Sequence, residues 1–348
     1  MARRLSTFFL NLESFVSTAR YDVVGLGNAI VDVIARAEED FLLGHGMYKG
    51  GMALIDEARA EAIYSAMGPA IEISGGSAAN TIAGLASYGA RTAFVGKVKD
   101  DVLGRAFAHD IRASGVAFNT KAAAEGPATG CSYILVTGDG ERTMNTYLGA
   151  AQDLTPADID PAQIEASRIV YLEGYLWDPK SAKEAFVKAA TIAHGAGRQV
   201  ALTLSDAFCV DRYRDEFLEL MRKGTVDLIF ANESELHSLY QTSDFDGALK
   251  QLSADTKLGV VTRSEKGCVV VSKDGVVAVP AFPIKQLVDT TGAGDLFAAG
   301  FLFGLVRDAG FHKAGRLGGL AAAEVIQHIG ARPQVALKEL AQQNGLPV

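Results

Sequence analysis

Cysteine is scarce in this sequence of 348 residues. The three cysteines, Cys131, Cys209 and Cys268, form no CxxC pair, and their odd number leaves one without a partner. We therefore expect neither a disulfide framework nor a cysteine-based zinc site, and we expect a cytoplasmic protein, because the cytosol keeps thiols reduced.

Long apolar runs and an excess of positive charge are also lacking. The longest apolar candidate, Leu296 to Val306, has the length of a core helix and falls short of the roughly 18 residues of a membrane span. The 33 Lys and Arg residues are outnumbered by 41 Asp and Glu residues, which gives a net charge of −8. We therefore expect no membrane and no nucleic-acid partner, although a small anionic ligand needs only a local row of backbone N–H groups.

Three common catalytic patterns are absent. The sequence has no GxxxxGK[ST] phosphate loop, and its six histidines are scattered without HExxH or HxxxH spacing. The run Gly75-Gly76-Ser77-Ala78-Ala79 fails the GxSxG nucleophile elbow at its last position. These absences set aside P-loop NTPases, histidine-based zinc enzymes and serine hydrolases of that type.

Glycine is abundant, with 37 residues against 9 prolines, and 49% of the chain is hydrophobic. The hydrophobic fraction is enough for a sizeable core, and the glycines indicate tight turns or places where the backbone meets a ligand. Residues 1–20 differ from the rest, because they combine three arginines with a short apolar cluster and weakly resemble an organellar presequence. The plainer interpretation is a disordered extension before one domain over residues 21–348.

From Tyr21 onward, short apolar runs alternate with segments of helical length. This alternation predicts an α/β fold with a mostly parallel sheet and helices on both faces. Strands are predicted at 21–27, 92–96, 132–136, 169–172, 199–204, 227–230, 259–262 and 268–271, and helices at 78–88, 181–194 and 213–221.

Two segments, at about 33–54 and 129–148, do not follow the alternation. The second reads as a hairpin around Thr137-Gly138-Asp139-Gly140. Paired together, the two segments could form a small antiparallel sheet over the carboxyl edge of the main sheet, where ligands of open α/β folds bind. We therefore interpret them as a lid.

The stretch from Asp289 to Asp295, DTTGAGD, is the most specific in the chain. Apolar residues continue after it at helical density, so Gly292 to Asp295 should form the first turn of a buried helix. The first N–H groups of a helix have no internal partner and attract phosphate, and Asp295 would stand beside that phosphate to accept a proton from an attacking hydroxyl. The alternative is a glycine-rich turn in which Asp295 is only a cap.

Two further stretches suit a polyhydroxylated ligand. One is the helix start that contains Gly75, Gly76, Ser77 and Asn80, where small residues open a surface and the amide can both donate and accept. The other, Gly25 to Asp32, begins like a dinucleotide fingerprint but has Ile30 in place of the third glycine. A tight turn with a serine cap remains the alternative for the first stretch.

Asn232 and Glu235 lie three residues apart after a strand and would share a face of a starting helix. Their oxygens suit hydrated magnesium, but the same spacing is also an ordinary capping box. The turn Thr262-Arg263-Ser264-Glu265-Lys266-Gly267 links two strands and could touch nucleotide phosphates, or it could be a plain charged turn.

Taken together, these stretches resemble the ribokinase-like (PfkB) family of carbohydrate and nucleoside kinases, from about Tyr21 to Pro333. The resemblance implies a three-layer ribokinase-like fold with a mostly parallel central sheet and a small β-sheet lid. It implies that Asp295 is the catalytic base beside an anion hole of Gly292, Ala293 and Gly294. The residues implied for the substrate hydroxyls are Asn28, Asp32, Gly75, Gly76, Ser77 and Asn80.

The resemblance also implies ATP and Mg²⁺. The residues implied for ATP are Asn232, Thr262, Arg263, Ser264, Gly267 and, from the lid, Arg142; those for Mg²⁺ are Asn232 and Glu235. One departure is Ser264, which stands where the family's nucleotide turn commonly has glycine. A requirement for K⁺ near Asp289 to Thr291 stays open, as does the choice between monomer and homodimer.

Within the family, runs such as Leu204-Ser205-Asp206-Ala207-Phe208 look like adenosine kinases. The expected reaction is therefore phosphorylation of the 5′-hydroxyl of a purine nucleoside, most simply adenosine to AMP, by ATP. The alternatives are a sugar kinase acting on ribose or fructose and a catalytically inactive nucleoside-binding regulator.

Overall fold

The computed structural model describes residues 19–347, in which the strands form one large and one small sheet. The extension predicted over residues 1–20 lies outside the described residues except for its last two. The large sheet has the order β14-β13-β12-β11-β10-β9-β1-β5-β6. Its strands are β1 (Tyr21–Leu26), β5 (Thr92–Val95), β6 (Ala117–Phe118), β9 (Ser167–Glu173), β10 (Gln199–Thr203), β11 (Leu228–Asn232), β12 (Leu258–Thr262), β13 (Cys268–Ser272) and β14 (Gly275–Val279).

The large sheet is parallel from β6 to β12, and at one edge β13 pairs antiparallel with β12 and β14 pairs antiparallel with β13. Both faces of the parallel strands are apolar, as is typical of sheets covered on both sides. In β1, for example, Val23 packs into the core on one face and Val24 into the core on the other. The strands predicted from the sequence are all present, with ends shifted by a few residues.

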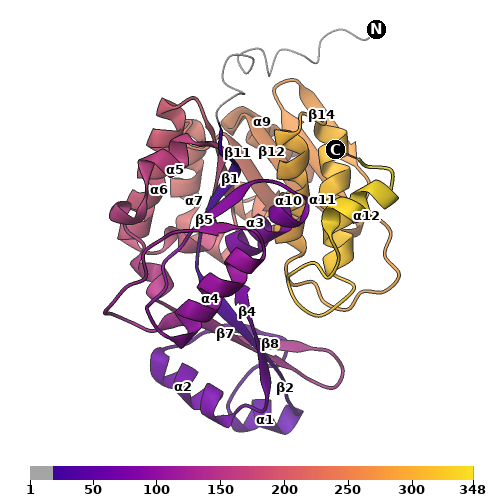
Figure 1. Ribbon diagram of the computed structural model, residues 1–348. Helices are drawn as coiled ribbons and strands as arrows, with labels where there is room; N and C mark the ends of the chain where they lie inside the picture. Colours follow the sequence, from indigo (N-terminus) through magenta and orange to yellow (C-terminus); the bar gives the residue numbers. More distant parts are fainter. Residues whose placement is uncertain (1–18, 348) are drawn as a thin grey trace.

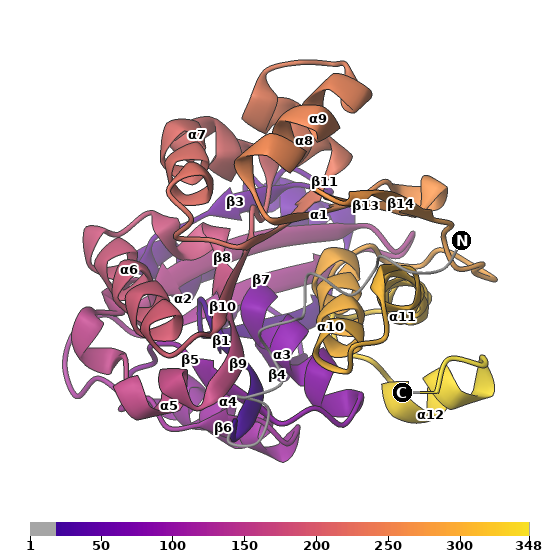
Figure 2. The same ribbon diagram turned by 90° about the horizontal axis from the view of Figure 1, so that it is seen from above.

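Helices cover both faces of the large sheet, which confirms the predicted three-layer fold (Figure 2). One layer contains α3 (Ser77–Ser87), α4 (Val102–Ala113), α10 (Ala293–Val306), α11 (Phe311–Val325) and α12 (Leu337–Gln343). The other contains α5 (Pro161–Glu165), α6 (Lys180–Gly195), α7 (Ala207–Arg222), α8 (Glu233–Tyr240) and α9 (Phe245–Asp255). Within residues 19–347 no helix combines the length and the hydropathy that crossing a bilayer requires.

The small sheet lies at one end of the molecule, at the bottom of Figure 1. Its order is β3-β8-β7-β2-β4, and helices α1 (Glu39–Gly44) and α2 (Glu57–Ala66) belong to the same part of the chain. The strands are β2 (Ile30–Arg36), β3 (Met52–Leu54), β4 (Ala70–Gly75), β7 (Thr129–Val136) and β8 (Arg142–Gly149). Four short 3₁₀ helices complete the elements: η1 (Ala150–Asp153), η2 (Pro156–Asp158), η3 (Gly174–Trp177) and η4 (Ser264–Lys266).

The small sheet corrects the sequence prediction in two respects. It is mixed and not antiparallel, because β2 pairs with β7 in parallel, as does β3 with β8. The predicted hairpin of β7 and β8 is present and antiparallel. The sequence analysis also did not anticipate β4, which pairs with β2 and leads directly into the glycines before α3.

The two faces of the small sheet differ. Val31, Val33 and Ala35 of β2 point to a core shared with Ile63 of α2. Because side chains alternate along a strand, Asp32 and Ile34 point to the opposite face. On that face the register aligns one apolar residue from each strand: Met52, Met144, Ile134, Ile34 and Ile71.

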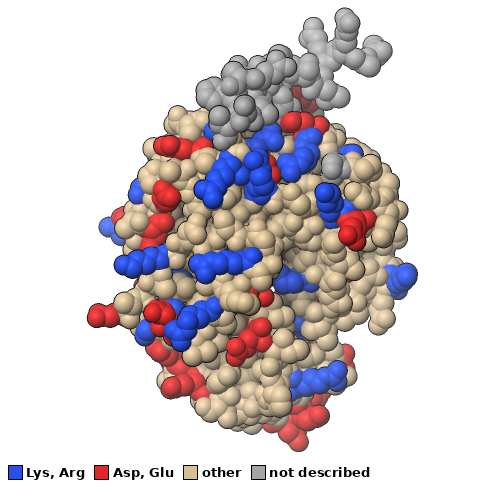
Figure 3. Space-filling view, in the orientation of Figure 1, with Lys and Arg blue, Asp and Glu red and all other residues tan. Residues whose placement is uncertain are grey.

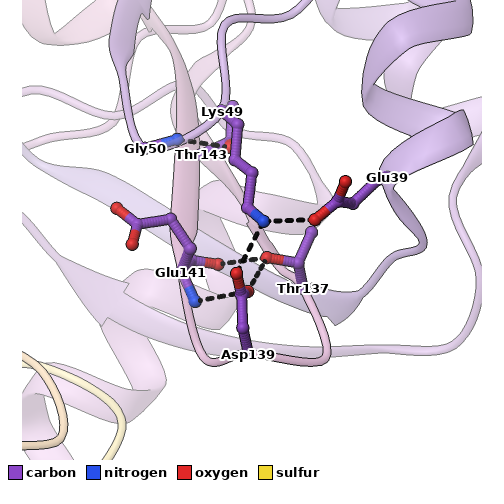
Figure 4. Close-up of polar contacts among 7 residues, drawn as sticks. All are labelled: Glu39, Lys49, Gly50, Thr137, Asp139, Glu141 and Thr143. Carbon is purple, nitrogen blue, oxygen red and sulfur yellow. Dashed lines mark hydrogen bonds and ion pairs between the residues drawn. The ribbon is translucent and has the colours of Figure 1, made fainter.

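Polar contacts tie the outer end of the small sheet together (Figure 4). The ammonium of Lys49 donates to Glu39, the first residue of α1, and to Asp139 in the β7–β8 turn, where the Nζ–Oδ2 distance is 2.6 Å. The same turn is closed by Thr137, whose hydroxyl donates to Asp139 Oδ1 at 2.6 Å. Residues from two distant stretches of chain are therefore held as one unit.

Helices α10 and α11 approach each other at glycines. A Cβ atom on Gly300 would lie 2.4 Å from the carbonyl oxygen of Leu317, and one on Gly304 would lie 2.6 Å from the Cα of Ala314. These neighbours are backbone atoms or are fixed to the backbone, so they cannot turn aside. The absence of side chains at these positions therefore sets the distance between the two helices.

We predict that Gly300→Ala lowers the free energy of unfolding by about 2 kcal/mol, because the added methyl group must push α11 away from α10. The matched control is Gly195→Ala at the exposed end of α6, where an added Cβ meets no atom within 4 Å. There the same change should raise the free energy of unfolding by about 0.5–1 kcal/mol through helix propensity. Urea denaturation of both variants measures the difference, and equal effects would contradict the packing argument.

Candidate active site

Predicted site residues from both sheets meet at the carboxyl edge of the large sheet. Strand β1 ends just before Gly27 and Asn28, β9 ends at Glu173, and helices α3 and α10 begin at this edge. The small sheet faces the same region, and Figure 3 shows an indentation of the surface between the two parts of the molecule. This is the place at which open α/β sheets bind ligands.

Asp295 lies in the first turn of α10 and contacts the first turns of α3. Its carboxylate accepts hydrogen bonds from Ser77 Oγ at 2.6 Å and from Asn80 Nδ2 at 3.1 Å. Burial raises the pKa of Asp295, while these two hydrogen bonds and the nearby charge of Arg332 oppose the rise. The result is an oriented carboxylate that takes up a proton more readily than an exposed aspartate.

The start of α10 has the geometry of an anion site. Gly292 is its N-cap residue with φ of +78°, and a Cβ there would lie 2.8 Å from Ala331 Cα, so glycine is required on both counts. A Cβ on Gly294 would meet nothing within 4 Å, so its surroundings are open. Within residues 19–347 no backbone acceptor takes up the N–H of Gly294 or Asp295. These donors can therefore receive an anion.

Arg142, on β8 of the small sheet, reaches the loop before the anion site. Its Nη1 lies 2.8 Å from Asp289 Oδ2 and donates to Thr291 Oγ1 at 3.1 Å, and both side chains of the ion pair are buried. Asp289 also accepts from the backbone N–H groups of Thr291 and Gly330. The Nε and Nη2 atoms of Arg142 are buried without a partner in the described residues, so they remain available to a ligand.

The predicted substrate residues meet beside Asp295. Gly76 has φ of +97°, and a Cβ there would lie 2.2 Å from the carbonyl oxygen of Asn28. A Cβ on Gly75 would lie 2.5 Å from Oδ1 of Asp32, so a side chain at Gly75 would displace that carboxylate. Burial raises the pKa of Asp32 to about 6, opposed by the charges of Arg332 and Arg142.

The sequence analysis missed two residues of the site, Glu173 and Arg332. Glu173 ends β9 and is buried against Asn28. Arg332 donates to the carbonyl and the hydroxyl oxygen of Ser74, just before Gly75, and burial lowers its pKa to about 10. For Glu173 a signal was available, because a charged residue directly follows the buried strand predicted at 169–172. The loop around Arg332 carried no such signal.

Asn232 and Glu235 form a capping box at the start of α8. Glu235 accepts from the Asn232 backbone N–H at 3.0 Å and from its Nδ2 at 2.5 Å, and Asn232 Oδ1 accepts from the Glu235 N–H. Burial raises the pKa of Glu235 to about 7. Each carboxylate oxygen of Glu235 therefore already accepts one hydrogen bond from Asn232. Mg²⁺ would fit this pair through the water molecules that it carries. In the described part of the chain no three acidic, histidine or cysteine side chains gather into a metal site.

The predicted nucleotide turn follows β12, whose end pairs with Asn232. The guanidinium of Arg263 lies 3.6 Å from the ring centroid of Phe245 and donates to Glu233 at 2.8 Å. Ser264 adopts φ of +51°, the left-handed conformation that glycine favours. Serine at this position therefore preserves the shape of a glycine turn at a conformational cost.

We predict that Ser264→Gly raises the free energy of unfolding by about 1 kcal/mol, because glycine adopts the left-handed conformation without a Cβ clash. Glu265→Gly is the matched control, since Glu265 lies in the same turn without a positive φ. This control should lower the free energy of unfolding. Urea denaturation distinguishes the two, and a loss of stability in both variants would argue against strain at Ser264.

The chain is similar to known kinases over most of its length. Residues 71–337 match the pfkB family of carbohydrate kinases. The crystal structure of adenosine kinase from Sinorhizobium meliloti is 56% identical with a TM-score of 0.88, and the match covers 94% of this chain and 100% of that chain. The structure of a probable sugar kinase from Rhizobium etli CFN 42 is 52% identical with a TM-score of 0.89, over 94% of this chain and 99% of that chain. Adenosine kinase of Saccharomyces cerevisiae is 27% identical over 330 residues, which cover 88% of this chain and 95% of that protein.

Proposed function

This chain belongs to the pfkB family of carbohydrate kinases, and from that premise we propose that it phosphorylates the 5′-hydroxyl of a purine nucleoside with ATP, converting adenosine to AMP. The likeness to adenosine kinases of S. meliloti and S. cerevisiae over nearly their whole length supports adenosine. The likeness to a probable sugar kinase supports the alternative, a kinase for ribose or fructose.

The apolar row on the small sheet is the observation that favours a nucleoside. Ile34 lies two residues beyond Asp32 on the same face of β2, which corresponds to about 7 Å along the strand. Met144 of the next-but-one strand, β8, extends this half-buried apolar surface, while Ile134 of β7 is buried between them. A sugar held at Asp32 would leave this surface bare, whereas a purine attached to that sugar would cover it.

In the proposed reaction, the hydroxyl of the substrate attacks the γ-phosphate in line. Asp295 accepts the proton of the attacking hydroxyl, while Ser77 and Asn80 hold its carboxylate in place. The free N–H groups of Gly294 and Asp295 stabilise the negative charge of the phosphoryl group by hydrogen bonds. Bound Mg²⁺ would supply further charge neutralisation on the phosphates.

Arg142 has two roles in this proposal. Its ion pair with Asp289 holds the small sheet as a lid against the loop before the anion site, and its free nitrogens reach toward the phosphates. A closed lid excludes water, which limits hydrolysis of ATP in the absence of substrate. The residues of the predicted nucleotide turn, from Thr262 to Gly267, would lie against ATP at the neighbouring strand end.

We predict that Asp295→Asn lowers kcat by about 10²–10⁴-fold, because the amide cannot accept the proton of the hydroxyl. Calorimetry should find nucleoside binding within about threefold of the wild type, since Asn keeps the shape of the side chain. Asp100→Asn, which alters an exposed ion pair with Arg105, is the control and should leave turnover unchanged. Near-normal turnover of Asp295→Asn would contradict the assignment of Asp295 as the base.

The substrate is tested by ADP release in the presence of ATP and adenosine, inosine, guanosine, ribose or fructose. We expect the highest kcat/KM with adenosine and a product that carries phosphate on the 5′-oxygen. A higher value with ribose or fructose would establish the sugar kinase instead. Nucleoside binding without ADP release would identify an inactive regulator.

A further inference from the structure

Two buried amides of the site have unpartnered oxygen atoms. Asn28 and Asn80 are 3% and 5% exposed, and in the described residues the Oδ1 atom of each lacks a hydrogen-bond partner. In both, the Nδ2 group donates to a carboxylate: that of Asn28 to Glu173 at 2.7 Å, and that of Asn80 to Asp295 at 3.1 Å. A buried acceptor without a donor costs free energy, so a ligand that supplies hydroxyl donors would satisfy both oxygens.

Glu173 is surrounded by donors on both carboxylate oxygens. Oε1 accepts from the backbone N–H and the Nδ2 of Asn28, and Oε2 accepts from the N–H of Ala78 in the first turn of α3, at 2.8 Å. Glu173 is 1% exposed, and a Cβ on Gly27 would lie 2.3 Å from Oε2. The protein therefore encloses the carboxylate, and both of its oxygens accept hydrogen bonds from the protein. Glu173 contacts Asn28 and leaves no oxygen exposed to a substrate.

We propose that Glu173 is a positioning residue that fixes the amide of Asn28 with its oxygen toward the substrate, and so selects substrates that carry a hydroxyl donor on the sugar. An ionised carboxylate can only accept hydrogen bonds, so the NH₂ group of Asn28 must point to it and Oδ1 must point away. The inference rests on the proposed function, because it takes the sugar of the nucleoside as the group that Asn28 meets.

Protonation of Glu173 would reverse this arrangement. Burial raises its pKa to about 7, opposed by the hydrogen bonds from Ala78 and Asn28, and the charge of Asp295 on α10 adds to the rise. Tyr171, two residues earlier on β9, stays neutral because burial raises its own pKa. A protonated Glu173 carries an O–H donor, which Asn28 can accept only by turning Oδ1 inward.

Glu173→Gln imposes the same reversal at every pH. The glutamine presents one oxygen and one NH₂ group to three donors. Two are backbone N–H groups that cannot turn, that of Ala78 at 2.8 Å and that of Asn28 at 3.3 Å, and the third is the side-chain amide of Asn28, which can turn. The oxygen of the glutamine should face Ala78, because this is the closer of the two fixed donors, and its NH₂ group should face the turned Oδ1 of Asn28. The substrate then meets the NH₂ group of Asn28 at the position where the wild type presents Oδ1 as an acceptor.

The decisive experiment compares adenosine with 2′-deoxyadenosine and 3′-deoxyadenosine in the wild type and in Glu173→Gln. We expect the variant to raise KM for adenosine about tenfold, with kcat within about threefold. For one of the two deoxy analogues KM should hardly change, because the hydroxyl that Asn28 accepts is already missing. Glu216→Gln, which alters a glutamate bonded to Trp177 and Lys183, is the matched control and should change none of these values.

An equal rise in KM for all three substrates would show that Glu173 is only a structural residue and would overturn the proposal. An unchanged preference of the variant for adenosine over both deoxy analogues would overturn it as well. If Glu173→Gln does not fold, the wild type alone decides. Its preference for adenosine over the informative deoxy analogue should fall as the pH is lowered from 8 to 7, a range that lies above the pKa of about 6 of Asp32, whereas titration of Asp295 affects all substrates alike. A constant preference over that range would overturn the proposal.

Failure of the proposed function is distinguishable from failure of this inference. If the wild type phosphorylates ribose or fructose but not adenosine, the function is wrong, and the same comparison is made with that sugar and its deoxy analogues. If it binds nucleosides without turnover, Kd from calorimetry replaces KM. In each case Glu173 retains its role only if Glu173→Gln removes the preference for one hydroxyl.

Discussion

The close contact between α3 and α10 is the constraint on which the site depends. Gly84 of α3 has no room for a side chain, since a Cβ there would lie 2.7 Å from Leu296 and 2.8 Å from Ala299 of α10. This packing brings the two helix starts together, so Ser77 and Asn80 from one helix reach Asp295 on the other. The proposed base, its orienting donors and the free N–H groups at the proposed anion site therefore all follow from one helix contact and the glycines that permit it.

Acidic side chains are concentrated at the proposed site of an anionic ligand. Burial raises the pKa of Asp32, Glu173, Glu235 and Asp295, and the backbone N–H groups of helix starts, together with Arg142 and Arg332, lie among them. Short-range donors hold each carboxylate in one orientation, so an excess of acidic residues over the whole chain does not oppose phosphate binding at this point. The negative net charge and the proposed chemistry are thus compatible.

Local sequence patterns predicted the parts of this structure that local physics controls. The buried strands, the helix start at Gly292 and the capping geometry of Asn232 and Glu235 each follow from residues a few positions apart. The parallel pairing of β2 with β7 and the addition of β4 could not be read in this way, because pairing depends on which distant strand lies alongside. Glu173 and Arg332 were missed for the same reason, since their partners, Asn28 and Ser74, are far away in the sequence.

The topology of the small sheet constrains the order in which the molecule can assemble. Strand β2 leaves the main body directly after β1, yet its parallel neighbour β7 begins only at Thr129, and β1 itself lies between β5 and β9. During synthesis, β2 must therefore wait for β7, and β1 for β9, before the edges that they share are closed. Such non-local pairings slow folding, so the chain exposes open strand edges late in translation, and the small sheet is the part whose folding depends most on the rest.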